Sequence, residues 1–368
     1  MRVVHVVKTL SIEYGGPARS VQGLVSALER NGIEAWLVTL EDGGAPYVDG
    51  INHFRVLGGG VFDVKRRMVD LIDEIKPDII HTHDCWMPKL HMCHVAARER
   101  GVPYVISPRG SLKRWSRNHK RLKKWVALQT YEGYDLKHAA ALHVTAADEH
   151  TQVAELGFNP NIIEVPNGVN LPSKIVEPSD CTRVKRRALF LSRIHYTKGL
   201  MNLVEAWSKV RPADWELEIV GTDADGYQCE VEARVAELGL QRDIIFSGPV
   251  IDVDKWAKYA AADLFVHPSF TENFGIVIAE ALYAGVPVIT TKGAPWQDLV
   301  SHKCGWWVDV GVEPLAEALK SAIALSDQER RAMGMRGHDL VEKKYTWDEV
   351  VKKMIESYGI TIAIHNSK

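Results

Sequence analysis

The sequence lacks the features that would place it across a membrane, outside the cell or on nucleic acid. It has no uninterrupted apolar run near the roughly 20 residues that a spanning helix needs. Its first apolar segment, residues 3–7, is too short for a signal peptide. Its five cysteines are scattered without a Cys-x-x-Cys pair, which is typical of reduced thiols, and its net charge is −2. We therefore expect a cytoplasmic protein with no nucleic-acid partner.

Two further absences narrow the chemistry. The Gly-x-Gly-x-x-Gly fingerprint does not follow the first expected strand, which argues against a nicotinamide enzyme. The chain also has no Asp-x-Asp in a loop at a strand end. The one close match, Asp252-Val253-Asp254, follows Gly248-Pro249 and is typical of a helix cap. We therefore expect no cofactor and no bound metal.

The 368 residues, of which 46% are hydrophobic and 25% charged, indicate two globular domains. Short strand-like runs alternate with helical patterns, which predicts a doubly wound α/β fold. We expect strands at residues 3–7, 35–40, 79–83, 104–107, 141–145, 188–192, 217–220, 244–247, 264–267 and 288–291. We expect helices at residues 17–31, 64–75, 89–100, 121–138 and 347–358, the last capped by Thr346. A polar stretch at residues 172–187 is the predicted linker.

Two glutamates, Glu272 and Glu280, carry the strongest functional signal. The pattern predicts a strand at residues 263–267 and a helix from Phe274 until Gly285 ends it. Glu272 then lies in the loop before the helix, where unpaired backbone N–H groups suit a phosphate. Glu280 lies on an otherwise apolar helix face, where an unpaired carboxylate is costly. A nucleotide-sugar fits this spacing; the alternative is a helix cap and a solvated helical residue.

A second loop supplies two cations, Arg193 and Lys198, after the first strand of the second half. Ligands bind at the carboxyl ends of strands in open α/β sheets. We therefore interpret both cations as ligands of a diphosphate, and the alternative is that both are solvated. The residues interpreted as walls for the base end neighbouring strands: Gly221, Pro249 and Val250.

With these motifs the chain resembles the retaining nucleotide-sugar glycosyltransferases of the GT-B architecture, often called family four. The resemblance covers nearly the whole chain. It is carried by Glu272-x7-Glu280, the Ser192-Arg193…Lys198-Gly199 loop, the Gly15-Gly16 loop, the run at residues 280–288 and the closing Tyr345-Thr346-Trp347. It implies two Rossmann-like domains facing each other across a cleft. The first, residues 1–170, binds the acceptor and the second, residues 184–345, binds the donor, while residues 346–368 cross back onto the first.

The resemblance also implies roles for single residues. Glu272 contacts the donor sugar, Glu280 binds the ribose, and Arg193 and Lys198 bind the diphosphate, which makes Glu272, Arg193 and Lys198 the catalytic candidates. Further donor contacts are implied for Asn273, Phe274, Gly275 and Ile276. Gly16 would face the donor phosphates, although a plain tight turn at Gly15-Gly16 is the alternative.

Candidates for the acceptor sugar follow two strands of the first half. We expect His83, Asp84 and Trp86 to reach the cleft, while His81 packs on the sheet. A metal site at the two histidines is the alternative, but no ligand set of recognised spacing completes it. Arg109 follows the next strand, where relatives carry a histidine near the reacting sugar. This departure leaves open which first-domain residue assists the chemistry.

A basic segment with interleaved aromatics spans residues 109–125. No Asp or Glu occurs between Glu99 and Glu132, and Trp115 and Trp125 lie among the Lys and Arg residues. A solvated basic helix is one interpretation. The other is a patch for an anionic membrane or a lipid-pyrophosphate acceptor, since each cation near an anionic leaflet contributes about 1 kcal/mol. It would extend the expected location to the inner face of the membrane.

The sequence thus predicts a metal-independent, retaining hexosyltransferase that moves a sugar from a nucleoside-diphosphate sugar to an acceptor hydroxyl. The expected acceptor is a glycan or a lipid-linked glycan in polysaccharide or glycolipid biosynthesis. One alternative is a sugar-phosphate synthase or phosphorylase, which would accept phosphate or a sugar phosphate. Another is a module that binds nucleotide-sugars without turnover.

Overall fold

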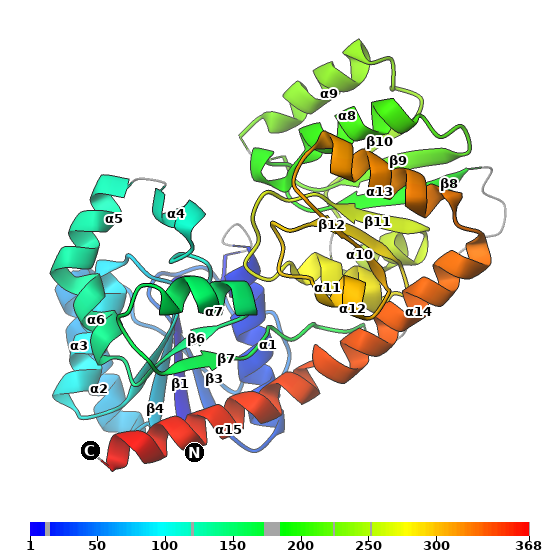
Figure 1. Cartoon of the computed structure of the whole chain (residues 1–368). Helices are drawn as coiled ribbons and strands as arrows, with labels where there is room; N and C mark the ends of the chain where they lie inside the picture. Colours follow the sequence, from blue (N-terminus) through cyan, green and yellow to red (C-terminus); the bar gives the residue numbers. More distant parts are fainter. Residues whose placement is uncertain (12–14, 119–120, 173–184, 224, 251, 368) are drawn as a thin grey trace. The chain divides into compact units, whose positions relative to one another are not determined.

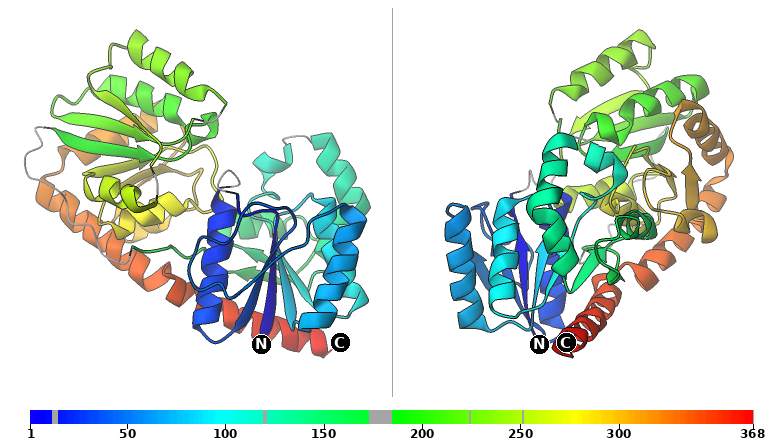
Figure 2. Two further views of the ribbon diagram at one scale, coloured as in Figure 1. Left: turned by 180° about the vertical axis from the view of Figure 1, so that it is seen from behind. Right: turned by 60° about the vertical axis from the view of Figure 1, so that its left-hand side comes forward.

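The computed structural model describes residues 1–11, 15–118, 121–172, 185–223, 225–250 and 252–367. The chain forms two compact units (Figure 1), the first of residues 1–170 with 346–368 and the second of residues 171–345. Each unit contains one parallel β-sheet with helices on both faces (Figure 2). Most of the predicted linker lies outside the described residues. Among the described residues, no helix has both the length and the apolar character that crossing a membrane requires.

The first unit has a seven-stranded sheet in the order β3-β2-β1-β4-β5-β6-β7. Its strands are β1 (Arg2–Val7), β2 (Glu34–Thr39), β3 (His53–Val56), β4 (Ile79–His83), β5 (Tyr104–Ser107), β6 (Ala141–Val144) and β7 (Ile162–Glu164). Its helices are α1 (Gly16–Arg30), α2 (Val61–Ile75), α3 (Pro88–Glu99), α4 (Arg114–Asn118), α5 (Arg121–Ala127), the π-helical η2 (Leu128–Glu132), α6 (Gly133–His138), α7 (Ala147–Ala154) and α15 (Trp347–Asn366).

Successive side chains along each strand point to opposite faces of the sheet, so this unit has two apolar layers. On β1, Val4 and Val6 join the core beneath α2 and α3. Val3 and Val7 face the opposite way and join the core that α1 and α15 cover. The helix α15, red in Figure 1, contacts α1 and extends to Asn366, beyond the predicted end at residue 358.

The second unit has a six-stranded sheet in the order β10-β9-β8-β11-β12-β13. Its strands are β8 (Arg186–Leu191), β9 (Trp215–Val220), β10 (Ile244–Gly248), β11 (Leu264–His267), β12 (Val288–Thr291) and β13 (Gly305–Val308). Its helices are the 3₁₀-helical η3 (Tyr196–Lys198), α8 (Leu200–Val210), α9 (Tyr227–Glu237), α10 (Asp252–Ala260), α11 (Ile276–Tyr283), α12 (Asp298–Ser301), α13 (Val312–Ala324) and α14 (Asp327–Lys344). The helices α8, α9 and α13 share one core with the sheet.

The predicted α/β fold is therefore confirmed for both units, and the differences have local causes. Three strands were not predicted, namely β3, β7 and β13, and each lacks the continuous burial of the central strands. The helix predicted at residues 121–138 is present, with the π-helical η2 in its middle. The Thr346 side chain caps α15 by accepting a hydrogen bond from the Glu349 N–H, as predicted.

The segments that leave and re-enter the first unit are joined to each other. Val169 pairs with Thr346 in an isolated parallel bridge, and the Trp347 indole donates a hydrogen bond to the Asn170 side-chain oxygen over 2.6 Å. A side chain at Gly168 would overlap the Trp347 ring, so glycine is required there. These contacts fix the start of α15 on the first unit.

Each sheet also has a point where the strand order reverses. It lies between β1 and β4 in the first unit and between β8 and β11 in the second. Loops that leave neighbouring strands in opposite directions diverge at such a point, and ligands of doubly wound proteins bind there. The carboxyl ends of these four strands are therefore the places to test the predicted site residues.

Candidate functional site

In the second unit, the loops after β8 and β11 are held together at the reversal of strand order. The Thr197 carbonyl accepts hydrogen bonds from the Phe270 N–H (2.8 Å) and the Ser269 hydroxyl (3.0 Å). Gly199 has a φ of +71°, and a Cβ there would overlap the Pro268 carbonyl oxygen, so only glycine allows this approach. The close packing brings Lys198 to the loop that carries Glu272.

Glu272 is the centre of this arrangement. Its Oε1 atom accepts hydrogen bonds from the Lys198 ammonium and from Nε2 of His267, the latter at 2.8 Å. The Glu272 N–H donates to the Gly293 carbonyl over 2.8 Å, which fixes the backbone. Burial alone would raise the pKa of Glu272, but Lys198 and His267 outweigh it, so this pKa lies well below its ordinary value. Glu272 is therefore a fixed carboxylate.

The alternative role of Glu272 as a helix cap is wrong. The helix α11 begins at Ile276, its N-cap residue is Gly275 with a φ of +83°, and no side chain caps it. The Gly275 carbonyl accepts a hydrogen bond from the Ile278 N–H over 2.9 Å, which closes a turn at the start of the helix. Asn273 lies in the same loop, between Glu272 and the buried Phe274. The loop therefore delivers the carboxylate beside a helix start, which is suited to an anion.

An aromatic cluster holds this helix start in place. The Phe274 ring packs against Trp296 and Tyr345, with ring centroids 5.3 and 5.5 Å away. The Trp296 indole also donates a hydrogen bond to the Phe274 carbonyl over 2.6 Å. The loop between Glu272 and α11 is thus anchored on the interior of the second unit.

Arg193 and Lys198 lie in the same loop, after β8, but their side chains have different surroundings. Lys198 is mostly buried, with 13% of its side chain exposed. Arg193 is exposed and makes no hydrogen bond or ion pair with another described residue. The structure therefore brings Lys198 to Glu272 and leaves Arg193 open to solvent.

Glu280 is buried and fully engaged, so its alternative reading as a solvated residue is wrong. Its Oε1 accepts from the Lys255 ammonium at 2.8 Å, and its Oε2 accepts from the Tyr259 hydroxyl at 3.0 Å. Both partners come from α10, four residues apart on one helix face. Neither partner was predicted from the sequence, because both lie more than 20 residues from Glu280 and on another helix.

The proposed walls for the base lie farther along the sheet. A Cβ on Gly221 would overlap the Ser192 carbonyl oxygen, so the end of β9 touches the start of the Arg193 loop. The Gly221 N–H donates to the Gly248 carbonyl over 3.0 Å, and Pro249 and Val250 follow directly. Gly221 thus contacts the loop that carries Arg193 and Lys198 directly, while Pro249 and Val250 are linked to that loop through the end of β9.

In the first unit, three non-glycine residues with positive φ gather at the ends of β4 and β5. They are Asp84 (92°), Trp86 (68°) and Arg109 (52°). Ser111 joins the two loops, because its hydroxyl donates to Asp84 Oδ1 (2.6 Å) and its carbonyl accepts from the Trp86 indole (3.2 Å). Backbone strain of this kind is typical of functional sites.

The loop after β1 lies on the other side of the reversal of strand order in the first unit. It ends at Gly15, the N-cap of α1 with a φ of 78°, and Gly16 is the first helical residue.

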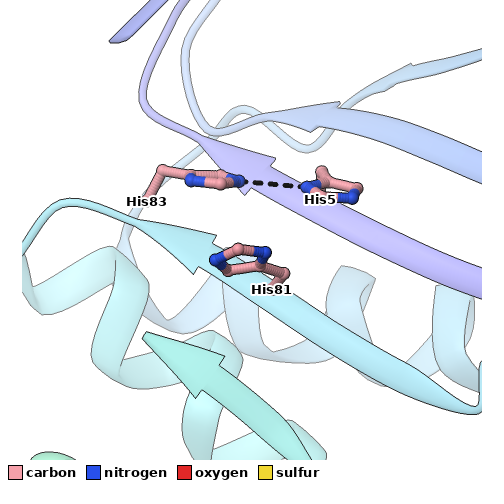
Figure 3. Close-up of side chains that lie close together, drawn as sticks. All are labelled: His5, His81 and His83. Carbon is pink, nitrogen blue, oxygen red and sulfur yellow. Dashed lines mark hydrogen bonds between the residues drawn. The ribbon is translucent and has the colours of Figure 1, made fainter. Parts of the chain in front are cut away.

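The prediction that His83 reaches a ligand is corrected by the structure. His83 is buried, its Nδ1 accepts from Arg109 at 3.0 Å, and its Nε2 bonds to Nδ1 of His5 at 3.0 Å (Figure 3). Arg109 also donates to the Asn167 side-chain oxygen over 2.5 Å. His83 therefore holds Arg109 in place. Arg109, in the loop after β5, is the candidate for contact with a ligand instead of His83.

His5, His81 and His83 form a buried cluster in which one ring nitrogen from each residue lies within 4.8 Å of the other two (Figure 3). The other hydrogen bonds of the cluster determine the tautomer of His81. The His143 Nε2–H donates to the Val165 carbonyl, so Ser107 donates to His143 Nδ1 and accepts from His81 Nε2. His81 Nδ1 then accepts from the Tyr358 hydroxyl.

In this pattern each lone pair of the three clustered rings is already used. Burial lowers the pKa of His81 and of His83 well below the ordinary value, and Arg109 adds to the effect, so the rings are neutral. A metal ion would have to displace these bonds beside the Arg109 guanidinium, and no described carboxylate belongs to the cluster to balance its charge. We therefore interpret the cluster as a support that joins α15 to the sheet and positions Arg109.

Two family models match the chain. The model described as "Glycosyl transferase 4-like domain" matches residues 15–168, and the model described as "Glycosyl transferases group 1" matches residues 181–339. The uncharacterized glycosyltransferase MJ1607 of Methanocaldococcus jannaschii is 26% identical over a 381-residue alignment that covers 95% of each chain. The phosphatidyl-myo-inositol mannosyltransferase of Mycobacterium leprae is 28% identical, covering 79% of this chain and 75% of that protein.

Solved structures show the same fold. Sucrose-phosphate synthase from Thermosynechococcus elongatus superposes with a TM-score of 0.79 at 21% identity, covering 99% of this chain and all of that one. HepE of Anabaena, solved with UDP and glucose, also has a TM-score of 0.79, at 18% identity, covering 98% of this chain and 100% of that one. Because the two matched models span both units and these relatives share the fold, the chain belongs to the family-four type of GT-B glycosyltransferases.

Proposed function

We propose that this glycosyltransferase is a retaining enzyme that uses a nucleoside-diphosphate sugar. The observation that carries the proposal is the contact of Lys198 with Glu272 beside the start of α11, at the reversal of strand order. A fixed carboxylate suits the hydroxyls of a donor sugar. Lys198, Arg193 and the helix start together suit a diphosphate. Glu280, beside Lys255 and Tyr259, would meet the ribose.

The similar proteins support the substrate classes. HepE has been solved with UDP-glucose, which is a nucleoside-diphosphate sugar. Named relatives include a phosphatidyl-myo-inositol mannosyltransferase and a lipopolysaccharide core mannosyltransferase of Rhizobium meliloti. We therefore propose a glycolipid or polysaccharide acceptor for this chain, with the strained loops at Asp84, Trp86 and Arg109 as its binding residues.

The proposed mechanism places departure of the diphosphate and attack by the acceptor hydroxyl on the same face of the sugar. A donor phosphate oxygen then takes the acceptor's proton. A covalent intermediate on Glu272 is disfavoured, because Lys198 and His267 hold the pKa of this carboxylate well below its ordinary value and a weakly basic carboxylate is a weaker nucleophile. Lys198 and Arg193 would stabilise the negative charge that develops on the leaving diphosphate.

We also propose that transfer needs no divalent metal. A metal ion in such a site neutralises the charge of the diphosphate. Here that charge would meet Arg193, which is exposed, Lys198 and the N–H groups at the start of α11. These groups can supply the same electrostatic stabilisation without an ion.

An anionic membrane is the proposed partner of the first unit. The side chains of Leu122, Trp125 and Trp115 are 75%, 58% and 48% exposed. Arg121 and Lys123 lie beside them, are exposed and have no acidic partner among the described residues. Aromatic and apolar side chains among cations are typical of surfaces that bind at the lipid headgroups.

The test is a thermal-shift panel of nucleoside-diphosphate sugars, followed by transfer assays with the donor that stabilises the protein. We expect one donor to raise the melting temperature, its sugar to be transferred with the anomeric configuration kept, and the rate to be unchanged in a chelator. Inversion of the anomeric centre would contradict the retaining mechanism. Activity that is lost in the chelator and returns only with added metal would contradict metal independence. Phosphate as the better acceptor would indicate a phosphorylase, and binding without donor consumption would indicate a binding module.

A further inference from the structure

His267, the last residue of β11, contacts the proposed catalytic carboxylate but has no assigned role. It has no exposed surface, and its ring stacks near Phe190 and Phe265 with interplanar angles of 21° and 9°. The Thr290 hydroxyl donates to the His267 carbonyl over 2.7 Å, which fixes the backbone. The imidazole is therefore buried beside two aromatic rings whose centroids lie 5.9 and 6.1 Å away, and its Nε2 lies 2.8 Å from Glu272 Oε1.

The hydrogen bonds settle which nitrogen of His267 carries the proton. Nδ1 is buried and has no hydrogen-bond partner among the described residues. Nε2 faces a carboxylate oxygen, which only accepts, so the hydrogen must be on Nε2. Burial lowers the pKa of His267 below its ordinary value, and this effect exceeds the opposing effect of Glu272. His267 is therefore a neutral donor at pH 7.

We propose that His267 is a positioning residue that fixes the direction of the Glu272 carboxylate toward the donor sugar. The inference rests on the proposed function of Glu272. Lys198 bonds to the same oxygen, but a lysine has a long flexible side chain that can follow a moving carboxylate. The imidazole has less freedom to follow, because its side chain is short and fully buried beside Phe190 and Phe265. It supplies direction without a second positive charge.

A pair of variants separates the hydrogen bond from the bulk of the side chain. His267→Gln keeps a neutral N–H donor near the position of Nε2, and His267→Leu fills the space without a donor. We expect His267→Leu to lower kcat by about 10- to 100-fold, which is typical of a misplaced reacting group, with unchanged affinity for the free nucleoside diphosphate. We expect His267→Gln to stay within about threefold of the wild type, as a conservative rescue.

A pH measurement adds a readout that a purely structural role would not change. The charged and titratable groups facing Glu272 among the described residues are Lys198 from the loop after β8 and His267 from β11. Loss of the His267 donor removes one cause of the lowered Glu272 pKa, so this pKa rises. A carbon-13 NMR titration of the Glu272 carboxyl in His267→Leu should therefore give a higher pKa than in the wild type and in His267→Gln.

The outcomes distinguish this inference from the proposed function. If the wild type consumes no donor, the proposed function is wrong, and the carboxyl titration still decides whether His267 holds Glu272. If the wild type is active and both variants match it in kcat and in the Glu272 pKa, His267 has no positioning role. If His267→Leu and His267→Gln lose activity equally while keeping their fold, the hydrogen bond is not the cause.

Discussion

Lys198 and Glu272 form an ion pair between two adjacent loops, although they are 74 residues apart in the sequence. Each side chain is 13% exposed, so the pair is largely shielded from solvent. A cation proposed to hold a diphosphate is thus bonded to a carboxylate proposed to hold a sugar. The two halves of the donor would therefore be recognised by groups that also fix each other.

We predict that Lys198→Ala and Arg193→Ala each lower transfer by about 100-fold or more, because each removes a preorganised positive charge. Lys198→Ala should have the larger effect, since it also frees Glu272. The measurement is kcat/KM for both variants, with melting temperature as a check on folding. Lys320→Ala is the matched control, because Lys320 is an exposed cation on α13 of the same unit. Near-normal turnover in both site variants would refute the diphosphate assignment.

A second prediction concerns Glu132 in the π-helical η2. Its Oε2 accepts the Trp86 N–H at 2.7 Å, while the neighbouring Tyr131 hydroxyl donates to the Trp86 carbonyl at 3.1 Å. Burial raises the pKa of Glu132 from an ordinary 4.5 to about 7, and the nearby Asp135 and Asp84 add to the rise. The folded state therefore favours the protonated carboxyl.

The sign of the pH dependence follows from this raised pKa. The contribution of Glu132 is fully present below pH 4.5, falls as pH rises to about 7, and is absent above that. Its size is on the order of 3 kcal/mol. Glu132→Gln should remove this dependence, so its free energy of unfolding relative to the wild type should increase between pH 4.5 and 7.5. A constant difference across that range in urea titrations would show that Glu132 does not titrate there.

For the first unit we predict binding to anionic vesicles through the segment around α5. The double variant Leu122→Ser/Trp125→Ser should weaken binding to phosphatidylglycerol-containing vesicles by tenfold or more, since burying one such side chain contributes about 1.5–3 kcal/mol. Wild-type binding should fall with added salt and be weak on phosphatidylcholine alone. Phe62→Ser is the matched control, because Phe62 is 82% exposed on α2. Equal loss in the control, or no wild-type binding, would exclude the membrane surface.

The sequence predicted the elements that have strong local signals. The strand at residues 264–267 has a continuous apolar run, and the following loop and helix were therefore placed correctly around Glu272. The loop containing Lys198 was predicted in the same way. Lys198 and Glu272 are brought into contact by the order of the strands in the sheet, which places β8 beside β11. Local patterns suggested two loops at one edge, but only the fold shows their contact.

The missed residues are buried polar groups whose partners are distant in sequence. His267 was assigned only to a strand, because nothing in its neighbourhood shows that Glu272 turns back to it. Lys255 and Tyr259 face Glu280 from another helix, more than 20 residues away. His83 was expected to contact a ligand, because residues at the carboxyl ends of strands often do. Its pairing with His5, however, depends on the register of β1 and β4. Such partners follow from three-dimensional packing, which spacing alone does not encode.

The last prediction separates the roles of the two glutamates. Glu280→Gln should weaken binding of both the free nucleoside diphosphate and the intact donor, because Glu280 is proposed to meet the ribose. Glu272→Gln should bind the free diphosphate at least as well as the wild type, since Lys198 would no longer be neutralised by the carboxylate. It should nevertheless lose turnover by several powers of ten, because it no longer holds the reacting sugar in place. Calorimetry with both ligands and a transfer assay measure these effects.

The buried partners of Glu280 require a control for this comparison. Glu280→Gln removes the carboxylate from a buried ion pair with the Lys255 ammonium, and breaking such a pair costs about 3–5 kcal/mol of stability. The double variant Lys255→Met/Glu280→Gln removes both charges and should recover stability but not nucleotide affinity. If it recovers affinity as well, Glu280 acts only through the fold. If Glu272→Gln loses diphosphate affinity while Glu280→Gln keeps it, the two roles are reversed, because the affinity would then follow the carboxylate at the helix start.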